Sequence, residues 1–381
     1  MHIAFNGWFW NQQRVGSGQY IRNLVTALQK VAPDLVMTLV VPDFMRDLDS
    51  LPENVNMAHA PAKFKGHLQK VWFEQRGYSQ AVRQIGADIA HVPYWGSPLN
   101  SKPARLVTSV LDLIPLVLPE YRGGTGAKFY TSLVSATAKG SAHIITLSEA
   151  SKADIVQHLD IPAEQITPTY LAADDRFRPV AYADEDELVR QKYDLPSEFV
   201  LYFGGFDIRK NVHQLLLAWT YAGPSLGEQI PLVLAGNQPK EWGTSRFPDL
   251  RKYAKELDVE KYSLWLGEIA EEDKPSLYRL AKAVVFPSRY EGFGLPILEA
   301  MACGTPVIAC HVSSIPEVTG DAAYLVPTDD ARQLGAAILA VMIQDDLHAH
   351  LANAARGQAT KFTWRKTAQK TLEVYEQVMR G

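Results

Sequence analysis

The sequence contains only two cysteines, Cys303 and Cys310, in 381 residues, and their spacing is not that of a metal site. Both lie among apolar residues, so we expect reduced thiols inside a core. The sequence has no apolar run of about eighteen residues, the length that a membrane-spanning helix requires. Residues 1–9 lack the charged segment that leads into the apolar part of a signal peptide. These absences favour a cytoplasmic protein.

The sequence also has no excess of basic residues: the formal net charge is −4 and the pI is near 6.2. Nucleic-acid-binding domains usually carry a basic excess, so nucleic acid is not an expected partner. The glycine pair Gly16 and Gly18 lacks the G-x-G-x-x-G spacing of dinucleotide-binding loops, because Tyr20 and Ile21 follow it. An oxidoreductase that uses nicotinamide is therefore disfavoured, and no cofactor is predicted.

The length and composition that are present fit a two-domain globular protein, with 47% hydrophobic and 21% charged residues. Short apolar runs alternate with amphipathic segments, which predicts an α/β architecture with parallel sheets. We place one Rossmann-like domain at residues 1–175, a linker at 176–186 and a second Rossmann-like domain at 187–361. Residues 362–381 have the pattern of a terminal helix.

Two carboxylates, Glu291 and Glu299, are separated by seven residues across the glycine-rich segment G-F-G-L-P-I-L. The apolar run 283–286 before them predicts a buried parallel strand. Gly292 and Gly294 permit backbone angles that other residues disfavour and allow a ligand to approach the main chain. The sequence thus predicts a strand followed by a ligand-binding turn.

A helix is expected to begin near Pro296, which suits a first helical position, and to end near Gly304. Free N–H groups at its start would bind an anion such as phosphate. Taken singly, Glu299 could complement the helix dipole and Glu291 could be a solvated loop charge. Because the pair flanks a phosphate-binding turn and carboxylates accept hydrogen bonds from hydroxyls, we predict a hydroxyl-rich ligand that contains a diphosphate.

A second segment has related chemistry: the apolar run 199–203 leads into Gly204–Asn211, a glycine turn that contains Arg209 and Lys210. An apolar helix pattern that includes Leu215 follows. Two cations at a helix start oppose its dipole unless an anion binds there. We therefore expect these cations to face an anion that the protein itself does not supply; a solvated basic loop is the alternative.

Together, these segments resemble the C-terminal half of the retaining glycosyltransferases of family 4, which have the GT-B fold. That fold has two Rossmann-like lobes whose parallel sheets face across a cleft, and a C-terminal helix that crosses back onto the first lobe. The E-x7-E motif at Glu291, the Arg-Lys loop and the segment 314–322 all match, so the resemblance covers most of the chain.

The resemblance implies a role for each matching residue. Arg209 and Lys210 would hold the donor diphosphate, Glu291 would contact hydroxyls of the donor sugar, and Glu299 would bind the ribose diol. Further donor contacts are implied for Gly16, Gly18, Gly205, Ile269, Gly292, Phe293, Gly294 and Leu295.

The N-terminal half contains two of the matching features. Gly16 and Gly18 resemble the family's first glycine loop, expected before a helix, although a tight turn alone would also explain them. Asp112 lies in the stretch near the acceptor face, where many members place His before this Asp. Leu111 occupies that position here, so the role of the His cannot be carried over. Asp112 remains a reactive-site candidate, and a turn cap is the alternative.

The resemblance implies transfer of a hexose, with retention, from a nucleoside-diphosphate sugar to a glycan or lipid-linked acceptor in polysaccharide biosynthesis. The first expectation for the donor is GDP-mannose. Asp47 and Asp49 have the D-x-D spacing of metal-dependent sugar transferases, but no buried strand precedes them, so we expect a solvated loop and no metal. A phosphorylase or epimerase, or a non-catalytic sugar-nucleotide-binding protein, would use a similar cleft.

Two other sequence patterns lead to hypotheses about where the acceptor binds. Residues 63–83 alternate basic and apolar side chains, which is typical of a helix packed on its domain and also of a surface that lies on anionic lipid at the inner membrane face. Aromatic residues follow predicted strand ends, where open α/β sheets bind ligands, and would form an acceptor platform or part of the core. These aromatic residues are Trp8, Phe9, Trp10, Tyr94 and Trp95.

Overall fold

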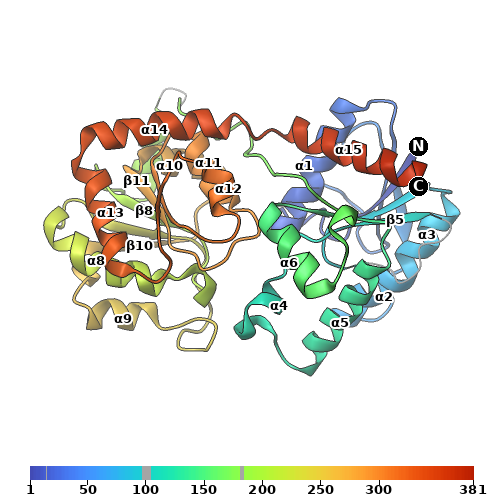
Figure 1. Cartoon of the computed structure of the whole chain (residues 1–381), viewed down its shortest axis with the longest axis horizontal. Coiled ribbons are helices and arrows are strands. Elements are labelled where there is room, and N and C mark those ends of the chain that lie inside the picture. The colour runs from blue at the N-terminus through green and yellow to red at the C-terminus, as the bar shows by residue number, and fades with distance from the viewer. Residues whose placement is uncertain (14, 97–103, 181–183) are drawn as a thin grey trace. The chain divides into compact units, whose positions relative to one another are not determined.

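The computed structural model describes residues 1–13, 15–96, 104–180 and 184–381 (Figure 1). The chain divides into two compact units. Unit 1 consists of Met1–Leu171 together with Thr363–Gly381, and unit 2 of Ala172–Phe362. Each unit has its own parallel sheet with helices packed around it.

The sheet of unit 1 has seven described strands in the order β3-β2-β1-β4-β5-β6-β7, and every neighbouring pair is parallel. Apolar residues dominate β1, where Ile3, Ala4 and Phe5 are fully buried, as expected for a strand covered on both faces. The strand order reverses between β1 and β4, which makes a topological switch point. The strands are β1 His2–Asn6, β2 Val36–Pro42, β3 Val55–Ala60, β4 Ile89–Val92, β5 Arg105–Ser109, β6 His143–Thr146 and β7 Ile166–Pro168.

The helices of unit 1 connect these strands, and the terminal helix α15 (Trp364–Arg380) returns to pack on α1 (Gly16–Val31). Its buried residues recur at helical spacing, and the hydroxyl of Tyr375 lies 2.5 Å from Nδ1 of the buried His91 on β4. The predicted return of a C-terminal helix to the first lobe is thereby confirmed. The others are α2 His67–Trp72, a π-helical turn Phe73–Gly77, α3 Tyr78–Gln84, α4 Ile114–Val117, α5 Thr125–Lys139 and α6 Glu149–Leu159.

The sheet of unit 2 has six described strands in the order β10-β9-β8-β11-β12-β13, again all parallel. Its switch point lies between β8 and β11. The strands are β8 Val200–Phe203, β9 Leu232–Ala235, β10 Ser263–Gly267, β11 Ala283–Phe286, β12 Val307–Cys310 and β13 Tyr324–Val326. The helices are α7 Glu185–Lys192, α8 Val212–Leu226, α9 Leu250–Glu256, α10 Lys274–Leu280, α11 Leu295–Ala302, α12 Ile315–Thr319, α13 Ala331–Ile343 and α14 Asp345–Ala359.

The chain passes between the units earlier than the sequence predicted. The sequence assigned residues 176–186 to a linker, but 176–180 and 184–186 belong to unit 2; residues 181–183 lie outside the described residues. Phe177 is buried with its ring centroid 6.0 Å from that of Tyr278, and Arg176 pairs with Glu271 at 3.2 Å. Composition indicated a linker here because the segment is polar and charged, but Arg176, Glu185 and Asp186 form ion pairs within unit 2.

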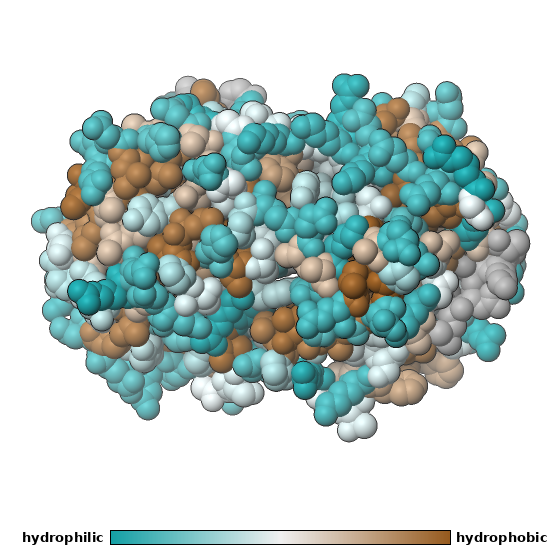
Figure 2. All heavy atoms as spheres, viewed as in Figure 1, coloured by the Kyte–Doolittle hydropathy of each residue, from teal (hydrophilic) through white to brown (hydrophobic). Residues whose placement is uncertain are grey.

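The two cysteines are buried and free, and burial raises the pKa of each thiol to about 12. Both therefore stay protonated at neutral pH, in agreement with the prediction of core thiols. Within the described ranges, no helix is both long and apolar enough to cross a membrane. On the face drawn in Figure 2, apolar residues are scattered among hydrophilic ones.

Candidate active site

The turn after β11 contains Glu291 and leads into α11. The helix begins at Leu295, one residue before the predicted start, with Gly294 in the left-handed region at φ 97° before it. Fewer amides are available at this start than expected, because Pro296 has no N–H and Ile297 donates to the carbonyl of Gly294 at 2.9 Å. Gly304 follows the helix at φ 80°, as predicted for a residue just past a helix end.

Glu299 is placed differently from the prediction. It is the fifth residue of α11 and lies beyond the first turn, so complementing the helix dipole does not explain it. Its side chain is buried, and the Tyr278 hydroxyl donates to Oε2 at 3.2 Å. Burial, which outweighs the favourable charge of Lys274, raises the pKa of Glu299 to about 7. A buried carboxyl of this kind gains from any ligand hydroxyls that donate to it.

This raised pKa predicts how Glu299 affects stability. Between its unfolded pKa near 4.5 and its folded pKa near 7, the folded state holds more protons, so the free energy of unfolding falls as the pH rises. Glu299→Gln removes this titration. We expect the variant to match the wild type near pH 5 and to exceed it by up to roughly 3 kcal/mol at pH 8. Urea unfolding at both pH values measures the difference, and a pH-independent difference would contradict the burial argument.

Arg209 and Lys210 end a short 3-10 turn, Ile208–Lys210, that joins β8 to α8. They precede α8 and are not part of its first turn, because Asn211 adopts a left-handed conformation at φ 57° before the helix starts. Since β8 and β11 are neighbours in the sheet, this turn and the Glu291 turn both follow the carboxyl ends of strands at the switch point.

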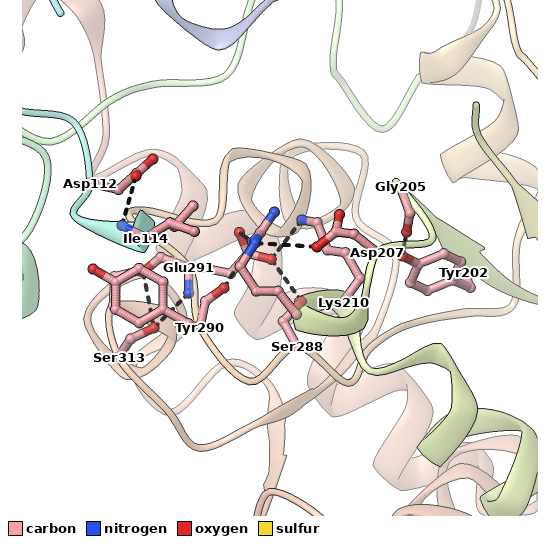
Figure 3. Close-up of polar contacts among 12 residues, drawn as sticks. Asp112, Ile114, Tyr202, Gly205, Asp207, Lys210, Ser288, Tyr290, Glu291 and Ser313 are labelled. Carbon is pink, nitrogen blue, oxygen red and sulfur yellow. Dashed lines mark hydrogen bonds and ion pairs between the residues drawn. The ribbon is translucent and has the colours of Figure 1, made fainter. Parts of the chain in front are cut away.

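Glu291 supplies the counter-charge for both cations (Figure 3). Lys210 Nζ lies 2.7 Å from Glu291 Oε1, and Arg209 Nη1 lies 2.9 Å from Oε2. Arg209 also donates to the carbonyl of Tyr290 at 2.8 Å, and its Nε is 3.7 Å from Asp207 Oδ1. The expectation that the cations face a gap without a protein anion is therefore wrong: they form a nearly neutral cluster with two carboxylates.

The cluster keeps Glu291 ionised despite its burial. Burial alone would raise the pKa of Glu291, but the charges of Lys210 and Arg209 and the hydrogen bonds of Lys210 and Ser288 lower it to about 2. The side chains of Glu291, Arg209 and Lys210 are only 12%, 13% and 15% exposed. Removing Glu291 would take the shared counter-charge from two poorly hydrated cations, and removing both cations would leave a poorly hydrated carboxylate without a cationic partner.

The other residues of unit 2 that were predicted to contact the donor lie in these two turns, at the start of α11 or just after β10. The carbonyl of Gly205 accepts a hydrogen bond from the Tyr202 hydroxyl. Ile269 is buried and lies two residues after β10. Phe293 is buried against Phe362, with ring centroids 5.9 Å apart. The structure places Gly292 and Gly294 in the turn that leads from Glu291 into α11, and Leu295 at the first position of that helix.

Sequence reasoning did not find three serines that hold the Glu291 turn. Ser288 donates to Glu291 Oε1 at 2.7 Å, and Ser313 and Ser314 donate to the Glu291 carbonyl at 3.0 and 2.9 Å. Ser313 also accepts the Glu291 N–H at 2.9 Å. Their contacts with Glu291 were not predicted, because serines in turns are common and Ser313 and Ser314 lie more than twenty residues from Glu291 in the chain.

In unit 1, Gly16 and Gly18 form the first turn of α1, so they do not make a loop before the helix. A Cβ on Gly18 would lie 2.1 Å from the carbonyl oxygen of Gln12, which makes glycine necessary there. A Cβ on Gly16 would meet nothing within 4 Å, so space is open for a ligand. Asp112 accepts a hydrogen bond from the N–H of Ile114 at 3.1 Å, the turn-capping contact that was the alternative interpretation (Figure 3).

The predicted aromatic platform is only partly formed at the switch point of unit 1. Trp10 and Tyr94 are buried, and the half-buried Phe9 meets Tyr94 edge to face with ring centroids 4.8 Å apart. The cation of Lys70 lies 5.3 Å and 4.8 Å from these two rings and 3.0 Å from the buried carboxylate of Glu74. The residues 63–83 thus pack against the domain at Lys70 and Glu74.

Comparison with known proteins supports the resemblance. Residues 15–176 match the model described as Glycosyltransferase Family 4, and residues 185–358 match Glycosyl transferases group 1. The chain is 30% identical over 380 residues to O-antigen chain mannosyltransferase B of Escherichia coli, with 93% of this chain and 97% of that protein covered.

Solved structures share the fold. Sucrose-phosphate synthase from Thermosynechococcus elongatus superposes with a TM-score of 0.75 at 22% identity, covering 100% of this chain and 99% of that one. HepE from Anabaena, solved in complex with UDP, gives a TM-score of 0.72 at 17% identity and covers 99% of each chain. The two parallel sheets and the returning helix therefore form the GT-B fold, and the chain belongs to the retaining glycosyltransferases of family 4, which use nucleotide sugars.

Proposed function

We propose that this enzyme transfers mannose from GDP-mannose to a hydroxyl of a glycan or lipid-linked acceptor, without a metal ion. The observation that carries the proposal is the cluster of Glu291, Arg209 and Lys210 at the switch point of unit 2, with the buried Glu299 on the helix that follows. Mannose is favoured because the E. coli relative that aligns over nearly the full chain is a mannosyltransferase. The base stays open to test, because HepE binds UDP.

In the proposed reaction, the bond between the anomeric carbon and the diphosphate oxygen breaks as the acceptor oxygen bonds to the same face of that carbon. The proton of the acceptor hydroxyl passes to the departing phosphate oxygen. Arg209 and Lys210 stabilise the charge that develops on the diphosphate, a term that is usually large in catalysis. Glu291 leaves its ion pairs with these cations and accepts hydrogen bonds from hydroxyls of the donor sugar instead. Glu299 accepts hydrogen bonds from the two ribose hydroxyls.

A panel of sugar nucleotides tests this proposal. A ligand that binds only the folded protein raises its unfolding temperature, so GDP-mannose should stabilise the chain more than GDP-glucose, UDP-glucose or UDP-N-acetylglucosamine. The panel is run with EDTA and again with magnesium, and the shifts should agree. A larger shift with a uridine donor would contradict the guanosine assignment, and a shift that needs magnesium would contradict metal independence.

The predicted membrane contact is restricted to the start of 63–83. Phe64 and Leu68 are 63% and 67% exposed beside the exposed Lys63 and Lys65, a combination that suits anionic lipid. We expect the protein to float with phosphatidylglycerol vesicles at low salt and Phe64→Ser/Leu68→Ser to bind them several-fold less. Ile343→Ser, which removes a similarly exposed side chain from unit 2, is the control. Equal flotation of the double variant and the control would contradict this contact.

A further inference from the structure

Unit 1 contains a cavity of about 440 Å³ that the proposed donor site does not use. Side chains from α4, α5 and α6, which neighbour one another in unit 1 (Figure 1), line it. Its polar lining consists of three basic side chains, Arg122, Lys128 and His158, and two hydroxyls, Thr131 and Ser132. Arg122, Lys128 and His158 are exposed, so a ligand can reach them from solvent.

The cavity concentrates basic groups without a protein counter-charge. No carboxylate lines it. Across the described ranges, no ion pair joins Arg122, Lys128 or His158 to an acidic residue, in contrast to Lys70 on α2, which pairs with Glu74. Arginine and lysine with neighbouring hydroxyls are the groups that bind phosphate oxygens. The lining therefore selects an anion and would disfavour a neutral sugar alone.

The position of the cavity connects it to the acceptor side of the reaction. Its wall includes Pro115 on α4, three residues after Asp112, so their Cα atoms are at most about 11 Å apart along the chain. This is a distance that a short oligosaccharide spans. A molecule whose anion is held in the cavity is therefore long enough to reach Asp112 when it carries a short oligosaccharide.

We infer that this cavity binds a phosphate or diphosphate group carried by the acceptor, an inference that rests on the proposed function. The group belongs to one of two sources, a phosphorylated sugar or a lipid diphosphate. Pro115 and Leu116 in the lining place apolar surface beside the basic groups. That surface favours the lipid diphosphate.

Calorimetry with inorganic pyrophosphate tests the site on the full chain. The protein is first saturated with GDP or UDP, whichever stabilises it more, so that Arg209 and Lys210 are occupied. Arg122→Gln/Lys128→Gln should weaken pyrophosphate binding at least tenfold. Lys139→Gln, which removes an exposed charge from the end of the same helix, should leave it unchanged. Ser132→Asp, which adds a negative charge inside the cavity, should weaken binding as well.

The source is distinguished by comparing farnesyl diphosphate with glucose 6-phosphate as competitors of pyrophosphate; competition by either supports the site. No pyrophosphate binding to the wild type, or equal affinity in the wild type and the double variant, would overturn the inference. In transfer assays, the double variant should raise KM for the acceptor and leave KM for the donor unchanged; a change confined to the donor would also overturn it. Failure of every sugar nucleotide to bind would overturn the proposed function, because donor binding is measured without pyrophosphate.

Discussion

Glu291→Gln is expected to lower kcat for sugar transfer by about 10²–10³-fold while nucleoside diphosphate binding stays equal or becomes tighter. Glu291 holds Lys210 at 2.7 Å and Arg209 at 2.9 Å, so in the proposed function the diphosphate displaces Glu291 from both cations. Glutamine has no charge with which to compete. It also cannot provide the charge-assisted hydrogen bonds to sugar hydroxyls that we assign to Glu291 in the transition state. The variant should therefore lose turnover without losing affinity for the nucleoside diphosphate.

Single-turnover kinetics and calorimetry with GDP separate the two effects. Ser288→Ala is the matched control, because it removes the 2.7 Å hydrogen bond to Glu291 Oε1 and leaves every charge in place. We expect Ser288→Ala to lose less than about tenfold in turnover. Glu291→Gln should unfold at a lower temperature when empty, since Arg209 and Lys210 lose their shared partner, and GDP should restore most of the difference. Unchanged turnover, or weaker GDP binding, would remove Glu291 from the assigned role.

The strands and the turns after them were predictable because their signals are local. Short apolar runs such as Val200–Phe203 and Ala283–Phe286 form strands that are covered on both faces of a parallel sheet. Gly294 and Gly304 adopt left-handed backbone angles just before and just after a helix. The family resemblance then supplied the fold and the pairing of the two lobes, which local patterns do not specify. The terminal helix α15 was predictable from its helical spacing of buried residues.

The ion pair between Glu291 and Arg209 was not predictable from local pattern, because 82 residues separate its members. It exists because β8 and β11, which are not consecutive in the chain, are neighbours at the switch point of the sheet. The sequence placed two cations, Arg209 and Lys210, at the start of a helix, where they oppose its dipole. We therefore expected a bound anion to balance them. In the structure Glu291 balances these charges, so the diphosphate that we propose would exchange with a protein carboxylate.

Arg209→Gln/Lys210→Gln is expected to abolish detectable binding of the sugar nucleotide and to lower kcat/KM by at least about 10³-fold. The variant loses both cations that we assign to the diphosphate. It also leaves Glu291 largely buried without a cationic partner, and the ionised form of Glu291 repels the incoming anion. The loss of binding thus has two causes, and the double variant alone does not distinguish them.

The triple variant Arg209→Gln/Lys210→Gln/Glu291→Gln separates these causes. It has no buried carboxylate without a cationic partner, so its free energy of unfolding should return toward that of the wild type. Binding of the donor should still be undetectable. In the double variant, burial raises the pKa of Glu291 above its unfolded value, so stability should fall as the pH rises above about 4.5. The triple variant should lack this pH dependence. Calorimetry with GDP-mannose decides the assignment: heats equal to those of the wild type in either variant would show that the two cations do not hold the diphosphate.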